Sequence, residues 1–205
     1  MKLGLEAGGA AFRGFRAAPG FTLVELMVTL AVAAILVTMA VPGFTSLINS
    51  NRLGSTANQL VAAVQSARIE AVRRNARVVM CRSVDGASCA GAGDEWPAWI
   101  VFVDTDADGN LDAGETVVEV GSPHAQVQVR ASGALTADRL LFRSDGFARD
   151  SASANGALLT AAFSVCMPTQ RPSENERLVS IGSGSRITTV ARARDGVCAT
   201  PPNSP

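Results

Sequence analysis

The sequence predicts an α+β fold in which one long N-terminal helix packs on a small antiparallel β-rich domain. Three observations predict this fold. An apolar run near the N-terminus is long enough to cross a membrane, an amphipathic pattern of helical period follows it, and the remainder consists of short β-like runs separated by Gly, Asp and Ser. A length of 205 residues accommodates one ordinary domain with an appendage.

The N-terminal apolar run covers residues 21–41 and contains one charged side chain, Glu25. About 20 apolar residues in a helix cross a hydrocarbon core of roughly 30 Å. Residues 1–20 are polar and Gly/Ala-rich, with three cations against one acid. Positive charge before an apolar run predicts that the N-terminus stays cytoplasmic. We therefore expect residues 21–42 to form the transmembrane first half of the helix.

Two ordinary explanations of this run are a secretory signal peptide and a plain membrane anchor. Thr38-Met39-Ala40 offers a small-x-small cleavage site, but Pro42 lies just beyond it and the run is longer than a usual signal core. Neither explanation accounts for Glu25. An unpaired carboxylate inside an apolar span costs about 2.5–3.5 kcal/mol on insertion scales, so it marks a function and implies a partner of opposite charge.

The residues around this carboxylate resemble a known processing site. Gly20 to Glu25 reads GFTLVE, which is similar to the cleavage site of type IV prepilins and type II secretion pseudopilins. The resemblance implies that residues 1–20 are a leader peptide, which a membrane prepilin peptidase removes after Gly20 before it methylates Phe21. It also implies that Glu25 pairs with the N-terminal amine of a neighbouring subunit during assembly.

After Pro42, which removes one backbone donor from the helix, residues 43–76 continue with a helical period. Apolar residues recur there at three- and four-residue intervals and form one stripe. They are Leu53, Ala57, Leu60, Val64, Ala67 and Ala71. A single helix from Phe21 to about Arg74 would be roughly 80 Å long. Its first half is apolar all round, whereas its second half has one apolar face and is expected to pack on a domain.

Residues 77–199 are predicted to form a β-rich globular head. Short β-forming runs are separated by turn residues, which is typical of a mostly antiparallel sheet or sandwich. The predicted strands are Val78–Arg82, Trp99–Val103, Thr116–Val120, Val127–Arg130, Leu140–Arg143, Leu158–Cys166, Leu178–Ile181 and Arg186–Val190. The tail, residues 200–205, contains three prolines and is expected to be disordered.

Two segments narrow the resemblance. SARIEAVRRNARVVMC at residues 66–81 and WPAWIVFVD at residues 96–104 are similar to the GspH/FimT group of minor pilins and pseudopilins. The resemblance implies a structural subunit at or near the tip of a type IV pilus or a type II secretion pseudopilus, and it leaves that choice open. The implied partners are other pilins, the prepilin peptidase and the inner membrane, with the C-terminal domain in the periplasm.

The sequence contains four cysteines and one histidine, and no two cysteines form a Cys-x-x-Cys pair. The cysteines are Cys81, Cys89, Cys166 and Cys198, and the histidine is His124. This is poor material for a zinc site, which needs clustered thiolates and imidazoles. An even number of cysteines in an exported chain favours disulfides, with three connectivities open. The short spacing favours a Cys81–Cys89 loop, and a Cys166–Cys198 bond would then hold the C-terminal tail.

Residues 104–115 read DTDADGNLDAGE and match the EF-hand calcium loop at its defined positions. The candidate ligands are Asp104, Asp106, Asp108, Asn110, Asp112 and Glu115, with Gly109 at the bend. The flanking runs resemble strands, so the loop would lie on a β-hairpin without paired helices. The predicted fold requires no cofactor. A calcium ion bound in this loop is the one candidate ligand. The alternative is an acidic, Gly-rich turn without a metal.

Three arginines near the C-terminus, Arg186, Arg192 and Arg194, raise a second functional hypothesis. Lys+Arg and Asp+Glu each number 18, so the overall charge gives no argument for nucleic acid. Some FimT-type minor pilins bind DNA during natural transformation through a C-terminal Gly-Arg-x-Arg motif, and this chain has alanine at position 191 where that motif has glycine. The alternative function is a DNA-binding minor pilin, and the simpler interpretation is ordinary surface arginines.

The sequence offers little for catalysis. His124 has no serine or cysteine nucleophile pattern nearby, and Ile181-Gly182-Ser183-Gly184 is a turn rather than a nucleophile elbow. No phosphate loop stands out, and no paired-carboxylate site stands out beyond the acidic loop. We therefore expect that the protein is not an enzyme.

Overall fold

The structure is a computed structural model that describes residues 20–150 and 156–203. Almost all of the predicted leader peptide therefore lies outside the described residues. The chain divides into two compact units between Val41 and Pro42. In order, its elements are α1 (Leu23–Arg74), β1 (Arg77–Ser83), β2 (Ala98–Asp104), β3 (Thr116–Gly121), β4 (Gln128–Ala131), the 3₁₀ helix η1 (Thr136–Asp138), β5 (Arg139–Phe142), β6 (Ala148–Arg149), β7 (Ala161–Cys166), β8 (Glu176–Ile181) and β9 (Ile187–Arg192).

The first unit contains the start of α1, from Leu23 to Val41. The exposed fraction of its large apolar side chains runs from 51% at Val32 to 74% at Leu23. By length and composition, this helix is able to cross a membrane. A continuous apolar surface of this kind calls for lipid or for another protein as its surroundings, because soluble monomers do not leave such areas in water.

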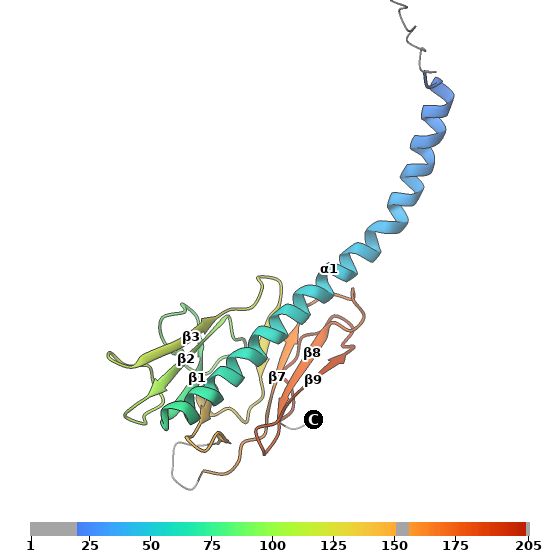
Figure 1. Ribbon diagram of the computed structural model, residues 1–205. Helices are drawn as coiled ribbons and strands as arrows, with labels where there is room; N and C mark the ends of the chain where they lie inside the picture. Colours follow the sequence, from blue (N-terminus) through green and yellow to red (C-terminus); the bar gives the residue numbers. More distant parts are fainter. Residues whose placement is uncertain (1–19, 151–155, 204–205) are drawn as a thin grey trace, which may run out of the picture. The chain divides into compact units, whose positions relative to one another are not determined.

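The second half of α1 belongs to the unit that contains the head. Its apolar stripe is buried as predicted: Leu53, Ala57, Leu60, Val64, Ala67 and Ala71 are at most 2% exposed. Figure 1 shows this part of the helix lying along both sheets. Burial of each leucine contributes about 1.5–3 kcal/mol, so the stripe fixes this part of the helix to the head.

The head consists of two antiparallel sheets. One has five strands in the order β3-β2-β1-β5-β6, and the other has four in the order β4-β7-β8-β9. Side chains of α1 and of the inner faces of both sheets form one large core cluster, which includes Trp96, Phe142 and Phe163. The fold class is therefore the predicted one, an α+β arrangement of a long helix packed on antiparallel sheets.

The five-stranded sheet has a second, smaller core on the face opposite α1. Its buried members are Val79, Cys81, Ile100, Phe102 and Leu141. Two loops supply the cover, since Cys89 of the β1–β2 connection and Leu111 of the β2–β3 connection pack against this cluster. Both connections therefore fold against the sheet.

After β9 the chain folds back over the four-stranded sheet. We call residues 193–203 the C-terminal strap. Cys198 is bonded to Cys166 of β7, and the Asn203 side chain accepts a hydrogen bond from the Ala134 N–H at 2.9 Å. Pro201 is buried. The disorder expected from residue 200 is therefore not found in residues 200–203, because a disulfide and a hydrogen bond hold the strap on both sides of the prolines.

All eight predicted strands are present, but one predicted strand is divided. The predicted strand Leu158–Cys166 begins in the four-stranded sheet only at Ala161. Leu158 forms a bridge with Arg149, and the Leu159 N–H donates to the Ala148 carbonyl at 3.0 Å. Residues 158–159 thus pair with β6, a two-residue strand that the sequence pattern did not reveal, and the chain then passes to the other sheet.

Candidate functional site

The predicted processing and assembly residues lie at the start of α1. Phe21 is 81% exposed, and Gly20 and Glu25 are exposed as well. The Glu25 N–H donates to the Thr22 hydroxyl at 3.2 Å, so Thr22 caps the helix. Thr22 was missed in the sequence reading, although the Thr-x-x-Glu spacing is the recognisable pattern of a capping box. The cap fixes where α1 begins, at Leu23, three residues after Gly20 and two before Glu25.

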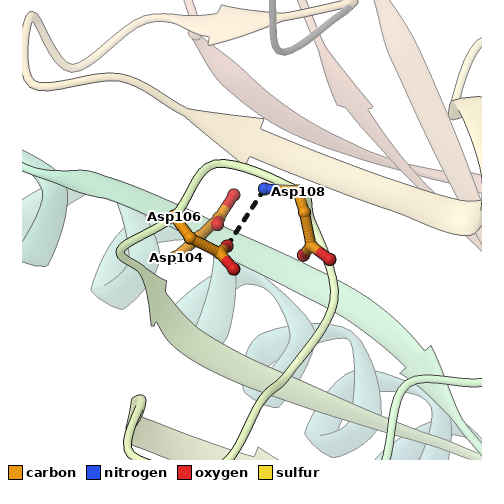
Figure 2. Close-up of side chains that lie close together, drawn as sticks. All are labelled: Asp104, Asp106 and Asp108. Atoms are coloured by element: carbon orange, nitrogen blue, oxygen red, sulfur yellow. Dashed lines mark hydrogen bonds between the residues drawn. The ribbon is translucent and has the colours of Figure 1, made fainter.

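The acidic loop after β2 brings together three of its six candidate calcium ligands. Carboxylate oxygens of Asp104, Asp106 and Asp108 lie within 4.8 Å of one another. Figure 2 shows the three side chains on this loop, with the Asp108 N–H directed at the Asp106 carboxylate, 3.2 Å away. Asp112 and Glu115 lie outside this group. The Glu115 carboxylate accepts hydrogen bonds from the N–H groups of Thr105 and Asp112.

Two arginines hold the acidic loop. Arg77 donates to the Ala107 carbonyl at 2.8 Å and lies 3.5 Å from the buried Asp104 carboxylate. Arg139 donates to the Gly109 carbonyl and to the Asn110 side chain. The loop therefore keeps an excess of negative charge, because five acidic residues face two arginines.

The acidic residues of the loop differ in their proton affinity. The charge of Asp108, together with burial and the charges of Asp106 and Glu115, raises the pKa of Asp112. Burial raises the pKa of Asp104, against the opposing effect of Arg77. Hydrogen bonds from Asn110 lower the pKa of Asp108. Ionised carboxylates this close together repel one another, and a bound cation would offset that repulsion.

The three C-terminal arginines have different surroundings. The Arg194 guanidinium contacts the buried Glu176 carboxylate at 3.0 Å, and the Arg194 N–H donates to the Asn175 side chain at 2.9 Å. Arg186 is exposed and Arg192 is half-buried. Within the described part of the chain, neither of these two guanidinium groups has a hydrogen-bond or ion-pair partner. Arg194 therefore holds the strap, while Arg186 and Arg192 are open to a partner.

The cysteines pair as their spacing favours. Disulfides join Cys81 to Cys89 and Cys166 to Cys198. The first closes the β1–β2 connection over the smaller core, and the second fixes the C-terminal strap. His124 lies apart from both, and its Nδ1 accepts a hydrogen bond from the Gln126 N–H at 3.3 Å.

Similarity to known proteins agrees with this architecture. Residues 56–185 match the family model described as type II transport protein GspH, and residues 16–41 match a prokaryotic N-terminal methylation motif. The pilin-like protein PilA1 of Thermus thermophilus is 35% identical over 107 residues, which are 51% of this chain and 58% of that relative.

Two solved structures are also similar. The type IV minor pilin FimU of Pseudomonas aeruginosa shares 18% identity, with 69% of this chain and 96% of that chain covered and a TM-score of 0.44. The minor pseudopilin EpsH from the type 2 secretion system of Vibrio cholerae shares 13% identity, with 68% and 97% covered and a TM-score of 0.47.

A long N-terminal helix, an antiparallel head and an N-terminal methylation motif define the class of pilin-like subunits. The chain belongs to the GspH family, whose model covers more than half of its residues.

Proposed function

We propose that this protein is made as a prepilin, cleaved after Gly20 by a prepilin peptidase, methylated on Phe21, and assembled into a type IV pilus or a type II secretion pseudopilus. The observation that carries the proposal is the exposed apolar helix, which contains one acidic side chain five residues after the cleavage site. Before assembly the helix crosses the inner membrane once, with the head in the periplasm, as the cations before the apolar run favour.

Assembly depends on Glu25 in this proposal. Its carboxylate pairs with the Phe21 amine of a neighbouring subunit, and the two opposite charges then stabilise each other inside the apolar filament core. Breaking a buried pair by removing one partner costs about 3–5 kcal/mol, so the glutamate is expected to be essential for incorporation.

Processing is tested by mass spectrometry of the N-terminus of the protein purified from its native envelope. A chain that starts at N-methyl-Phe21 is the expected result. A start near Val41 indicates an ordinary signal peptide, and an intact Met1 indicates a plain anchor. Either of those results excludes the proposed route.

Assembly is tested by measuring how much of each variant is recovered in sheared filament fractions. Glu25→Ala is expected to be processed but left in the membrane, whereas Glu25→Asp retains the charge and is expected to assemble in part. Glu70→Ala is the matched control, because Glu70 lies on the head part of α1 and pairs with Arg73 and Arg74. Normal incorporation of Glu25→Ala contradicts the mechanism.

We further propose that the acidic loop binds calcium. The support is the group of three neighbouring carboxylates and the negative charge that the two arginines leave unbalanced. Asn110, Asp112 and Glu115 would complete six to eight oxygen ligands. Extracellular calcium modules have a Kd of about 0.1–1 mM, so about 10 mM calcium would stabilise the head by roughly 1.4–2.7 kcal/mol.

The calcium proposal is tested by thermal unfolding in calcium and in a chelator. The parent chain is expected to melt at a higher temperature in calcium, and Asp106→Asn/Asp108→Asn is expected to lose that shift. Asp94→Asn, at an exposed aspartate outside the loop, serves as the control and should keep it. An equal shift in the double variant, or no shift in the parent, contradicts calcium binding.

DNA binding, the alternative function, retains Arg186 and Arg192 as candidate contacts, whereas Arg194 already pairs with Glu176. A gel shift with a salt series tests it, because phosphate contacts weaken steeply as salt rises. An unchanged shift in Arg186→Ala/Arg192→Ala excludes these arginines as the DNA site.

A further inference from the structure

We propose that the outer edge of β9 binds an extended acidic polypeptide segment of a partner protein, which adds a strand to the four-stranded sheet. The inference goes beyond filament assembly and stands separately from it, since it involves only the head. It rests on the hydrogen-bonding pattern of β9, on the regularity of this edge, and on the two unpaired arginines at its ends.

The hydrogen-bonding pattern shows which backbone groups of β9 are free. The Gly182 N–H donates to the Arg186 carbonyl at 2.9 Å, so residues 182 and 186 form a hydrogen-bonded pair of the β8–β9 hairpin. Hydrogen-bonded pairs alternate along an antiparallel ladder. Thr188, Val190 and Arg192 therefore bond to β8, given their register with Ser180, Leu178 and Glu176.

The N–H and C=O groups of Ile187, Thr189 and Ala191 consequently point away from the sheet. Within the described part of the chain, these groups have no hydrogen-bond partner. Residues 188–191 are exposed, including Val190 at 51%. Three residues thus present alternating donors and acceptors along one side of the strand, and a second peptide strand has the matching pattern.

The other sheet edges are shorter or irregular, as natural edges usually are. β6 has two residues and β4 has four. β3 has six, but its pairing with β2 contains a register shift. β9 also has six residues, pairs with β8 without a break, and contains neither proline nor lysine. β9 is therefore the edge best suited to accept another strand.

Charge indicates what kind of strand binds. Arg186 directly precedes β9 and Arg192 is its last residue, so six strand positions place them about 20 Å apart. Their even positions place both side chains on the face away from α1, the same face as Thr188 and Val190. A partner strand with acidic residues six positions apart would put one carboxylate opposite each arginine, in closely spaced non-hydrogen-bonded pairs.

A peptide fits this edge better than a nucleic acid does. Phosphate oxygens accept hydrogen bonds but cannot donate them, so they would leave the outward carbonyls of Ile187, Thr189 and Ala191 without donors. The third arginine of the proposed DNA motif, Arg194, is committed to Glu176. A strand satisfies the donors, the acceptors and both free cations together.

The test uses the full chain in detergent and the labelled peptide Glu-Val-Thr-Val-Thr-Val-Glu, with its lysine-ended counterpart as the control ligand. The glutamate-ended peptide is expected to bind, and the lysine-ended peptide at least tenfold more weakly. Arg186→Glu/Arg192→Glu should invert this preference, while Arg171→Glu, at an exposed arginine of the β7–β8 connection, should not. No detectable binding of the acidic peptide up to about 1 mM overturns the proposal.

The backbone contribution is tested with Thr189→Pro. Proline removes an N–H that points away from β8, so the sheet keeps its internal hydrogen bonds and the variant should melt near the parent temperature. Peptide affinity should fall about tenfold or more, whereas Thr189→Val, which keeps the N–H, should bind within about twofold of the parent. Unchanged binding by a folded Thr189→Pro overturns the proposal.

Hydrogen exchange on the parent gives an answer even if the proline variant does not fold. The amides of Thr189 and Ala191 should exchange quickly in the free protein and slowly with peptide, while those of Thr188 and Val190 are slow in both. Exchange at Thr189 that the peptide does not slow overturns strand addition. Binding of short duplex DNA that needs both arginines, without peptide binding, assigns this surface to nucleic acid instead.

Discussion

At the scale of single residues, Trp99 determines what its neighbour on the next strand must be. Trp99 of β2 is 1% exposed and lies opposite Gly121 of β3 in the ladder. A Cβ atom at position 121 would come within 2.5 Å of the indole ring. A ring buried between strands cannot swing aside, so this position accepts glycine because of close approach rather than because of backbone conformation.

We predict that Gly121→Ala destabilises the head by about 1–3 kcal/mol, the usual cost of overpacking a core. Thermal unfolding measures the loss. Gly91→Ala is the matched control, because nothing lies within 4 Å of a Cβ at position 91. Equal melting temperatures for Gly121→Ala and the parent would mean that Trp99 repacks without cost.

Asp85 holds the β1–β2 connection inside the Cys81–Cys89 loop. Its carboxylate accepts hydrogen bonds from the N–H groups of Ala87 and Ser88, both at 2.9 Å, and from two serine hydroxyls. These bonds, led by the one from Ala87, lower the pKa of Asp85 far below its ordinary value. A carboxylate whose folded pKa is depressed stabilises the fold only while it is ionised.

We predict that Asp85→Asn lowers the melting temperature at pH 7, and that the difference from the parent narrows as the pH falls below about 4. The stabilisation is complete above the unfolded pKa of about 3.9 and is lost as the pH falls toward the depressed folded value. Melting curves at several pH values measure it, with Asp94→Asn as the control. A difference that stays constant down to pH 2 would contradict the assigned cause.

At the scale of elements, periodicity predicted most of the fold. The stripe from Leu53 to Ala71 repeats at helical intervals and is buried throughout, because one face of a helix has to meet one core. The division of the predicted Leu158–Cys166 strand was not predictable, since β-forming residues run through both parts and only tertiary pairing separates them.

The candidate sites also differ in how far the sequence alone could predict them. GFTLVE is local, so sequence alone identified Gly20, Phe21 and Glu25 as candidates for processing and assembly. The pairing of Arg194 with Glu176 joins residues 18 apart across two elements. No spacing rule reveals such a contact, and the three arginines of the DNA hypothesis therefore looked equivalent in the sequence.

Both disulfides act on connecting elements, but they close loops of different length. The sequence separation is 8 for Cys81–Cys89 and 32 for Cys166–Cys198. In the chain-entropy model these loops correspond to about 2.5 and 3.7 kcal/mol. We predict that Cys166→Ala/Cys198→Ala lowers the free energy of unfolding by about 1 kcal/mol more than Cys81→Ala/Cys89→Ala, as measured by urea unfolding. Equal or reversed losses would show that local packing outweighs loop closure.

At the scale of the whole molecule, the chain combines two units that differ in where their apolar side chains lie. The unit that ends at Val41 exposes apolar side chains throughout the described part of its helix, whereas the unit from Pro42 onward contains the buried core. The core draws on α1 from Leu53 onward and on both sheets. All side chains of this core therefore come from the second unit.

We predict that a fragment of residues 42–205 folds without detergent and melts within about 4 °C of the full chain in detergent, a difference that corresponds to at most roughly 1 kcal/mol. A fragment of residues 61–205, which lacks Leu53, Ala57 and Leu60, should fail to give a cooperative transition. Circular dichroism measures both. If the 42–205 fragment fails to fold, the head needs the part of α1 that precedes Pro42.

The C-terminal strap also has a consequence for the order in which the head is completed. Cys166 belongs to β7, and its partner, Cys198, follows it by 32 residues in the chain. A ribosome releases the chain from the N-terminus onward, so α1 and the first sheet emerge long before the residues that secure the second sheet. The four-stranded sheet is therefore secured only after residues 193–203 have been made, and a chain interrupted before Cys198 leaves Cys166 without its disulfide partner.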